Sequence, residues 1–194
     1  MSNLVPYVIE RSGQVERTFD IYSKLLKERI VFIDGEITDA VASLVVSQLI
    51  FLEADNPNKE INLYINSPGG SVTAGLAIYD TIKYISSPVK TICMGQAASM
   101  AAIILAAGEK GSRHALPSSR VMIHQPFGGV EGQASDIQVQ TEEIIRLKKL
   151  TIKYLAADCG KKESEVEKDI LRDKFMTAEE TMNYGIIDSV ITRK

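Results

Sequence analysis

The chain has 194 residues, of which 45% are hydrophobic and 24% are charged, and its formal net charge at pH 7 is -3. This length and composition fit one globular domain with a sizeable core, and the small negative charge argues against nucleic acid or a membrane surface as a partner. Two cysteines are too few for a disulfide framework or a cysteine metal cluster. We therefore expect a reducing, cytoplasmic setting.

Short β-branched runs alternate with helical patterns along most of the chain. The sequence predicts strands over residues 29–33, 61–65, 89–94 and 120–124, and helices over residues 39–55, 71–85 and 99–108. This alternation is typical of an α/β domain with parallel strands. Because the runs at 61–65 and 89–94 are almost continuously apolar, we expect a central sheet that is covered on both faces.

The second half of the chain predicts a helical arm. Residues 133–158 read as one helix of roughly 40 Å that ends at Gly160 as a C-cap. Its apolar stripe comprises Ile137, Ile144, Ile145, Leu147, Leu150 and Leu155, and part of this stripe needs burial outside its own domain. A head with a protruding arm, which self-associates through that arm, follows from this pattern.

Local signals also define the last elements. Thr177 and Glu180 have the spacing of a capping box, which predicts a short helix that stops at Gly185. A final strand is expected over residues 186–191. No linker or shift in composition divides the chain, so we expect residues 1–194 to form a single domain.

Serine catalysis needs a base, and the chain offers two histidines. His114 lies in a polar, turn-rich segment and reads as a solvated loop residue. His124 ends the apolar strand at 120–124, so it should lie at the carboxyl edge of the sheet, where α/β proteins bind ligands. A purely structural, hydrogen-bonded histidine is the alternative.

Ser99 lies between a predicted strand and a predicted helix, preceded by "GQAA", which reads as a tight turn. Its hydroxyl would lie at the positive end of the helix among small residues, as in a nucleophile elbow. The usual G-x-S-x-G pattern is absent, because Gly95 lies four residues before Ser99. The alternative is that Ser99 is only the N-cap of the helix.

Acyl transfer also needs donors for a developing oxyanion. The backbone N–H of Met100 is one candidate, and the segment "NSPGGSV" with Gly69 and Gly70 offers another, because glycine lets the backbone approach a ligand closely. An ordinary strand-to-helix turn is the alternative there. The segment matches neither phosphate-loop pattern, which argues against nucleotide binding.

A carboxylate should orient the histidine, but spacing does not identify it. Five aspartates follow His124, namely Asp136, Asp158, Asp169, Asp173 and Asp188. Triads occur in several chain orders, so the choice stays open at this point.

Several long motifs resemble the ClpP family, the proteolytic subunits of the Clp protease (peptidase family S14). They are "SPGGSVTAGLAIYDTI", "GQAASMAA", "MIHQPFGG", "GQASDI" and "LRDKFMTAEETMNYGIID", together with "ERTFDIYSKLLKERIVF" near the start. The resemblance implies Ser99 as nucleophile, His124 as base and Asp173 as carboxylate. Gly70 and Met100 are then the oxyanion donors.

The resemblance also implies an α/β, crotonase-like (ClpP-type) fold of repeated strand-strand-helix units in two stacked seven-subunit rings. Residues 1–17 would be an axial gating segment and 125–160 the handle between rings, with the remainder forming the head. Arg172 would couple ring contacts to the active site, and Tyr64 and Tyr84 would help dock an AAA+ Clp unfoldase of the ClpX, ClpA or ClpC type. Asn62 departs from the aromatic residue that relatives often have there.

The implied activity is that of a serine endopeptidase that degrades unfolded polypeptides. No cofactor or metal is expected in this subunit, because ATP is used by the partner unfoldase. Two other functions compete with this interpretation: a non-catalytic ring subunit of the same fold, and a crotonase-type acyl-CoA enzyme. The presence of all three implied triad residues argues against the first, and an acyl-CoA enzyme would not need them.

Overall fold

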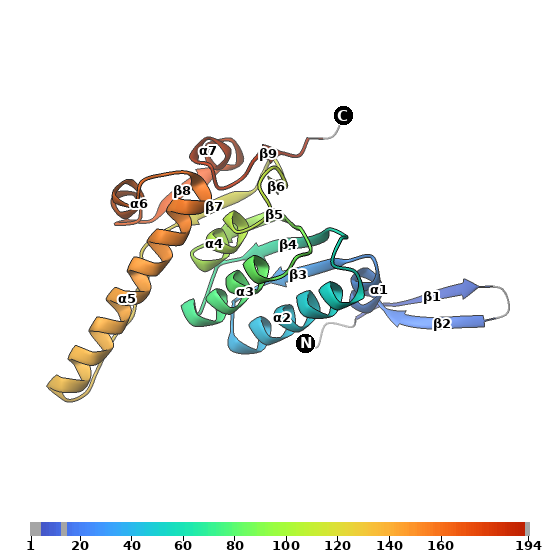
Figure 1. The fold of residues 1–194 in the computed structure, drawn as a ribbon, viewed down its shortest axis with the longest axis horizontal. Helices are drawn as coiled ribbons and strands as arrows, with labels where there is room; N and C mark the ends of the chain where they lie inside the picture. The colour runs from blue at the N-terminus through green and yellow to red at the C-terminus, as the bar shows by residue number, and fades with distance from the viewer. Residues whose placement is uncertain (1–4, 13–14, 193–194) are drawn as a thin grey trace.

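The computed structural model describes residues 5–12 and 15–192. Strands β1 (Tyr7–Ser12) and β2 (Val15–Asp20) form an antiparallel hairpin, which α1 (Ile21–Lys27) joins to the head (Figure 1). The Asp20 side chain caps α1 by accepting a 3.0 Å hydrogen bond from the Ser23 N–H. The expected gating segment therefore falls mostly on this hairpin, while residues 1–4 and 13–14 lie outside the described residues.

The head is built on one mainly parallel sheet. Its first part runs through β3 (Ile30–Asp34), α2 (Asp39–Asp55), β4 (Ile61–Ser67), α3 (Val72–Tyr84), β5 (Val89–Ala98), α4 (Met100–Ala106), β6 (Arg113–Ala115) and β7 (Arg120–Ile123). The strand order is β3-β4-β5-β6-β9, and β7 pairs with the far end of β5. The predicted α/β class and the predicted parallel pairing of strands 3, 4, 5 and 7 are confirmed.

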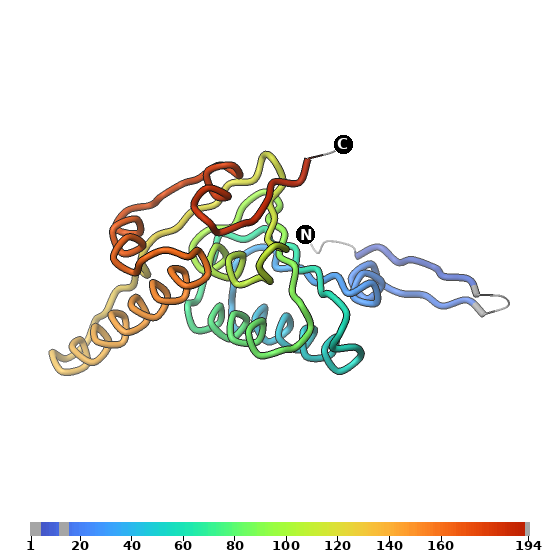
Figure 2. The backbone as a smooth tube through the Cα atoms, turned by 45° about the horizontal axis from the view of Figure 1, so that its top comes forward, coloured from blue at the N-terminus to red at the C-terminus, as the bar shows by residue number. Residues whose placement is uncertain are grey.

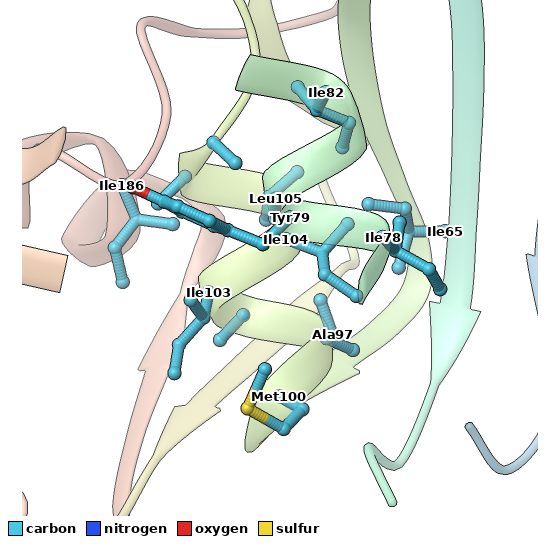
Figure 3. Close-up of a cluster of buried hydrophobic side chains, with 14 of the residues drawn as sticks. Ile65, Ile78, Tyr79, Ile82, Ala97, Met100, Ile103, Ile104, Leu105 and Ile186 are labelled. Atoms are coloured by element: carbon cyan, nitrogen blue, oxygen red, sulfur yellow. The ribbon is translucent and has the colours of Figure 1, made fainter. Parts of the chain in front are cut away.

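Helices α2, α3 and α4 lie over one face of the sheet (Figure 1). Ile78 and Tyr79 of α3 meet Met100 and Ile104 of α4 in a buried cluster between the helices and the sheet (Figure 3). On β4, buried residues alternate with partly exposed ones such as Tyr64. The expectation that both faces of the sheet are covered is therefore wrong within the single chain. The apolar run of β4 includes the half-buried ring of Tyr64, which lies on the face of the sheet opposite the helices.

The second half contains α5 (Ala134–Cys159), α6 (Glu163–Asp169), β8 (Lys174–Thr177), α7 (Ala178–Tyr184) and β9 (Ser189–Val190). Gly160 ends α5 with a φ of 67°, as predicted for a C-cap. Helix α5 projects from the head on one side and the hairpin projects on the other (Figures 1 and 2). Only its last third is buried, so Ile137, Val139 and Ile145 stay exposed.

The capping box at Thr177 and the stop of α7 at Gly185 are confirmed. Three features of the strands differ from the prediction. The final strand is shorter than residues 186–191, the strand β5 continues through the segment read as a turn, and β8 runs antiparallel to β7. The short elements β6, α6 and β8 have too few residues to produce a recognisable periodicity.

A buried ion pair fastens the C-terminal segment to the sheet. The guanidinium of Arg113 on β6 donates to both carboxylate oxygens of Asp188, at 3.0 and 2.6 Å. The backbone N–H groups of Arg113 and Gly111 donate to the same carboxylate. Arg113 is 5% exposed, so the pair is largely shielded from water.

Candidate active site

Ser99 lies at a strained junction between β5 and α4. Its φ of 56° and ψ of -124° lie in a region that side chains rarely adopt, as expected for the sharp turn of a nucleophile elbow. Its side chain makes no capping hydrogen bond to α4, so the interpretation as a plain N-cap is wrong. All residues of α4 are buried, which anchors the turn on its helical side.

His124 reaches Ser99 because β7 pairs in parallel with the end of β5. The register aligns Ala98 with Met122, and the Ser99 N–H donates to the Met122 carbonyl at 2.8 Å. Two residues further along, the His124 Nε2 lies 2.9 Å from the Ser99 Oγ. This contact suits a hydroxyl that donates to an unprotonated ring nitrogen.

The structure selects one of the five aspartates. The Asp173 Oδ1 lies 3.2 Å from the His124 Nδ1. The other four are placed elsewhere: Asp158 contacts Tyr79 and Lys83, Asp169 pairs with Lys174, Asp188 pairs with Arg113, and Asp136 lies in the first turn of α5. A hydrogen on Nδ1 that points to Asp173 leaves Nε2 free to accept from Ser99.

The strand β8 brings Asp173 to this position. In the antiparallel pair of β7 and β8, Ile123 at the end of β7 lies opposite Lys174 at the start of β8. The residue after Ile123 and the residue before Lys174 therefore lie side by side. These are His124 and Asp173. The sequence did not predict this strand, which explains why spacing alone left the carboxylate open.

The backbone N–H groups of Met100 and Gly70 stay predicted oxyanion donors. Met100 begins α4, where the first amides have no partner within the helix. At the neighbouring loop, Ile37 donates to the Gly69 carbonyl and Ser71 donates to the Ile37 carbonyl. This bridge does not use the N–H of Gly70 that lies between them.

Glycine is required in this loop by close contacts. A Cβ on Gly69 would lie 2.6 Å from the Ala98 carbonyl oxygen and 2.7 Å from the Ser99 Cβ. A Cβ on Gly70 would lie 2.3 Å from the Ile37 carbonyl oxygen. Ile37 was not singled out from the sequence, and its only signal there is its position just after the Gly35 turn.

Open space lies next to His124 and Asp173. A cavity of about 480 Å³ is lined by these two residues, by Gln125 and Phe127, and by residues 170–172. Arg172 lines this cavity, is exposed, and makes no ion pair with any residue in the described part of the chain. The implied coupling role of Arg172 therefore stays a prediction.

A second cavity of about 480 Å³ lies on the open face of the sheet. Tyr64 lines it together with Tyr22, Phe32 and Met94, and the Tyr64 and Phe32 rings stack with centroids 5.5 Å apart. Tyr84 is 87% exposed at the end of α3 and does not line this cavity. Asn62 lies on the same partly exposed face of β4. Docking at these residues stays a prediction.

His114 is not a solvated loop residue, contrary to expectation. It lies on β6, its Nδ1 is 2.8 Å from the Ser189 Oγ, and burial lowers the pKa of its ring. Both cysteines are free, and burial raises the thiol pKa to about 11 for Cys93 and to about 12 for Cys159. Neither thiol approaches the thiolate state at neutral pH, so neither competes with Ser99 as a nucleophile.

Within the described residues, no helix combines the length and the apolar character needed to cross a bilayer.

The model of the Clp protease family matches residues 13–194. The ATP-dependent Clp protease proteolytic subunit of Borreliella afzelii (strain PKo) is 56% identical over 194 residues, which cover 100% of this chain and 98% of that relative. Both matches span the elements that carry Ser99, His124 and Asp173. The chain therefore belongs to the Clp protease family.

Proposed function

We propose that this chain is a serine endopeptidase that cleaves unfolded polypeptides and is supplied with them by a Clp ATPase. The observation that carries the proposal is the 2.9 Å contact between the Ser99 Oγ and the His124 Nε2 at a strained elbow. Family membership and a relative that is a Clp protease proteolytic subunit support it. An acyl-CoA enzyme of the crotonase type would leave this contact without a use.

In the first step, the Ser99 Oγ attacks the carbonyl carbon of the scissile peptide bond. His124 takes the hydroxyl proton on Nε2, and Asp173 stabilises the resulting imidazolium through Nδ1. The carbonyl π electrons move to the oxygen. The N–H groups of Gly70 and Met100 donate to this oxyanion, and one such donor is worth about 10²- to 10³-fold in rate.

In the second step, the tetrahedral intermediate collapses and the carbon–nitrogen bond breaks. His124 gives its proton to the departing amine, and an acyl group stays on Ser99. Water then attacks the acyl carbon while His124 again serves as the base, which releases the carboxylic acid and restores the serine hydroxyl. The protein's own groups supply every proton transfer, so we propose no cofactor in this subunit.

Copies of the chain would enclose these sites by assembling into two stacked seven-subunit rings. Exposed Ile137, Val139 and Ile145 on the projecting half of α5 support contact through this helix, because such residues gain from leaving water. The segment 125–160 would then be the handle between rings. The hairpin of β1 and β2 projects on the other side and would form the axial gate, where a Clp ATPase of the cytoplasm delivers its substrate (Figure 1).

The test is mass spectrometry of the intact protein after treatment with a fluorophosphonate, followed by peptide mapping. We expect one adduct on Ser99, and we expect none in the Ser99→Ala and His124→Ala variants. Hydrolysis of a short peptide should be lost in the same variants while the assembly stays intact by native mass spectrometry. An unlabelled Ser99 in an assembled sample with added Clp ATPase would contradict the proposal.

A further inference from the structure

The carboxylate of Asp173 has few direct restraints. Its side chain is 58% exposed, and its hydrogen bond to His124 at 3.2 Å is the longer of the two contacts in the triad. Asp173 lies in the loop 170–173, which connects α6 to β8. The position of the carboxylate is therefore set mainly by the conformation of this loop.

An ion pair joins the two ends of that loop. Asp169 is the last residue of α6 and Lys174 is the first residue of β8, and the Lys174 Nζ lies 2.6 Å from the Asp169 Oδ1. The Lys174 side chain is 38% exposed and the Asp169 side chain is 23% exposed, so water screens the pair only in part. A contact across the ends of a four-residue loop limits the conformations that the loop can adopt.

The buried ring of Tyr184 lies next to this ion pair. The Lys174 Nζ lies 5.0 Å from the centroid of the Tyr184 ring on α7, which is a favourable distance for a cation over an aromatic face. The Tyr184 hydroxyl is buried and makes no hydrogen bond of standard geometry with a described residue. Partial burial opposes ionisation of Asp169, but Lys174 first, and then the nearby Tyr184 hydroxyl, lower the pKa of this carboxyl.

The loop is also tied to the strand end that carries the base. The backbone N–H of Gln125, the residue after His124, donates to the Ile170 carbonyl at 2.8 Å. The Gln125 side chain reaches the Leu171 carbonyl at 3.4 Å. The loop is thus held on one side by the neighbour of His124 and closed on the other side by Lys174.

We propose that Lys174 is a positioning residue for the cleavage reaction: its ion pair with Asp169, backed by Tyr184, fixes the loop 170–173 so that Asp173 faces His124. This inference rests on the proposed function, because it assigns Lys174 a part in the same reaction. Lys174 does not touch the reacting atoms. Its effect passes through the backbone of the loop to Asp173 alone.

The test compares Lys174→Met with Lys174→Arg and with the control variant Lys161→Met. Lys161 also lies over the Tyr184 ring, at 4.6 Å, and pairs with Glu165, but it does not close the Asp173 loop. We expect Lys174→Met to lower kcat for a short peptide by about tenfold, since a small displacement of a catalytic group is costly, with KM unchanged. Lys174→Arg should restore most of kcat, and Lys161→Met should match the parent protein.

A second comparison separates positioning from a general structural effect. In an Asp173→Asn background, adding Lys174→Met should cause no further fall in the rate of fluorophosphonate labelling, because the group that it positions is already gone. A further fall by the same factor as in the parent background would overturn the inference. So would an unchanged kcat in the assembled Lys174→Met variant.

The parent protein distinguishes failure of this inference from failure of the proposed function. If the parent labels at Ser99 and cleaves the peptide while Lys174→Met behaves identically, only the positioning role is wrong. If Ser99 of the assembled parent neither labels nor supports cleavage with a Clp ATPase added, the proposed function is wrong, and this inference is overturned with it.

Discussion

Replacing Gly69 with alanine tests whether the glycine loop and the serine elbow form one unit. Gly69 has a φ of +93°, and its added Cβ would lie 2.6 Å from the Ala98 carbonyl oxygen, whereas ordinary contacts begin at 3.4 Å. The two backbones must therefore separate by about 0.8 Å, and a displacement of about 1 Å at a catalytic site can cost about 10²-fold in rate. We expect Gly69→Ala to lower Ser99 labelling and peptide cleavage by about that factor.

Gly111→Ala is the matched control for the backbone strain. Gly111 has a similar φ of +90°, but its added Cβ would meet nothing within 4 Å. Gly111→Ala should lose about 1–2 kcal/mol in the free energy of unfolding, measured with urea, because alanine disfavours positive φ. Gly69→Ala should lose this amount and more, because its Cβ also overlaps the backbone of Ala98. Only Gly69→Ala should lose activity. An active Gly69→Ala variant with a normal labelling rate would refute the contact between loop and elbow.

Two further predictions concern stability. Partial burial opposes ionisation of Asp188, but the hydrogen bonds and charge of Arg113 outweigh it and lower the pKa of this carboxyl. Because the pKa is lower in the folded state, ionised Asp188 stabilises the protein above the usual aspartate pKa of about 4, and this stability is lost as the pH falls below that value. The free energy of unfolding of Asp188→Asn, measured with urea, should therefore depend less on pH in this acidic range than that of the parent protein. An equal acid dependence in both proteins would argue against this pair. Thr177→Ala removes the capping box shared with Glu180 and should lower the free energy of unfolding by about 1 kcal/mol, while an unchanged melting temperature would show that the cap contributes nothing.

The elements that the sequence predicted well carry local signals. The capping box at Thr177, the C-cap at Gly160 and the stop at Gly185 depend on residues within one turn of each site. Longer helices such as α3 and α5 have enough residues to show periodicity. By contrast, β6 spans only Arg113–Ala115 and exists because it pairs with β5 and β9. Pairing between distant segments leaves no such local pattern.

The same distinction applies to the site. His124 ends one predicted strand and Ser99 follows another, so their placement at one sheet edge could be inferred from the sequence. The geometry at Ser99 is sharper than the sequence suggested, because β5 continues to Ala98 and the whole turn occurs at one residue. Asp173 could not be chosen by spacing, because an antiparallel strand of four residues brings it to His124. Only the resemblance to the Clp protease family had selected it.

The order of the elements along the chain has a consequence during synthesis on the ribosome. The serine and the histidine directly follow β5 and β7, which precede α5, whereas the carboxylate comes after that long helix has been made. The nascent chain thus displays a nucleophile and a base long before Asp173 leaves the exit tunnel. Because β8 pairs only with β7 within the described residues, the aspartate docks by adding this one strand to an existing edge. The set of Ser99, His124 and Asp173 is therefore complete only after residues beyond 173 have been translated.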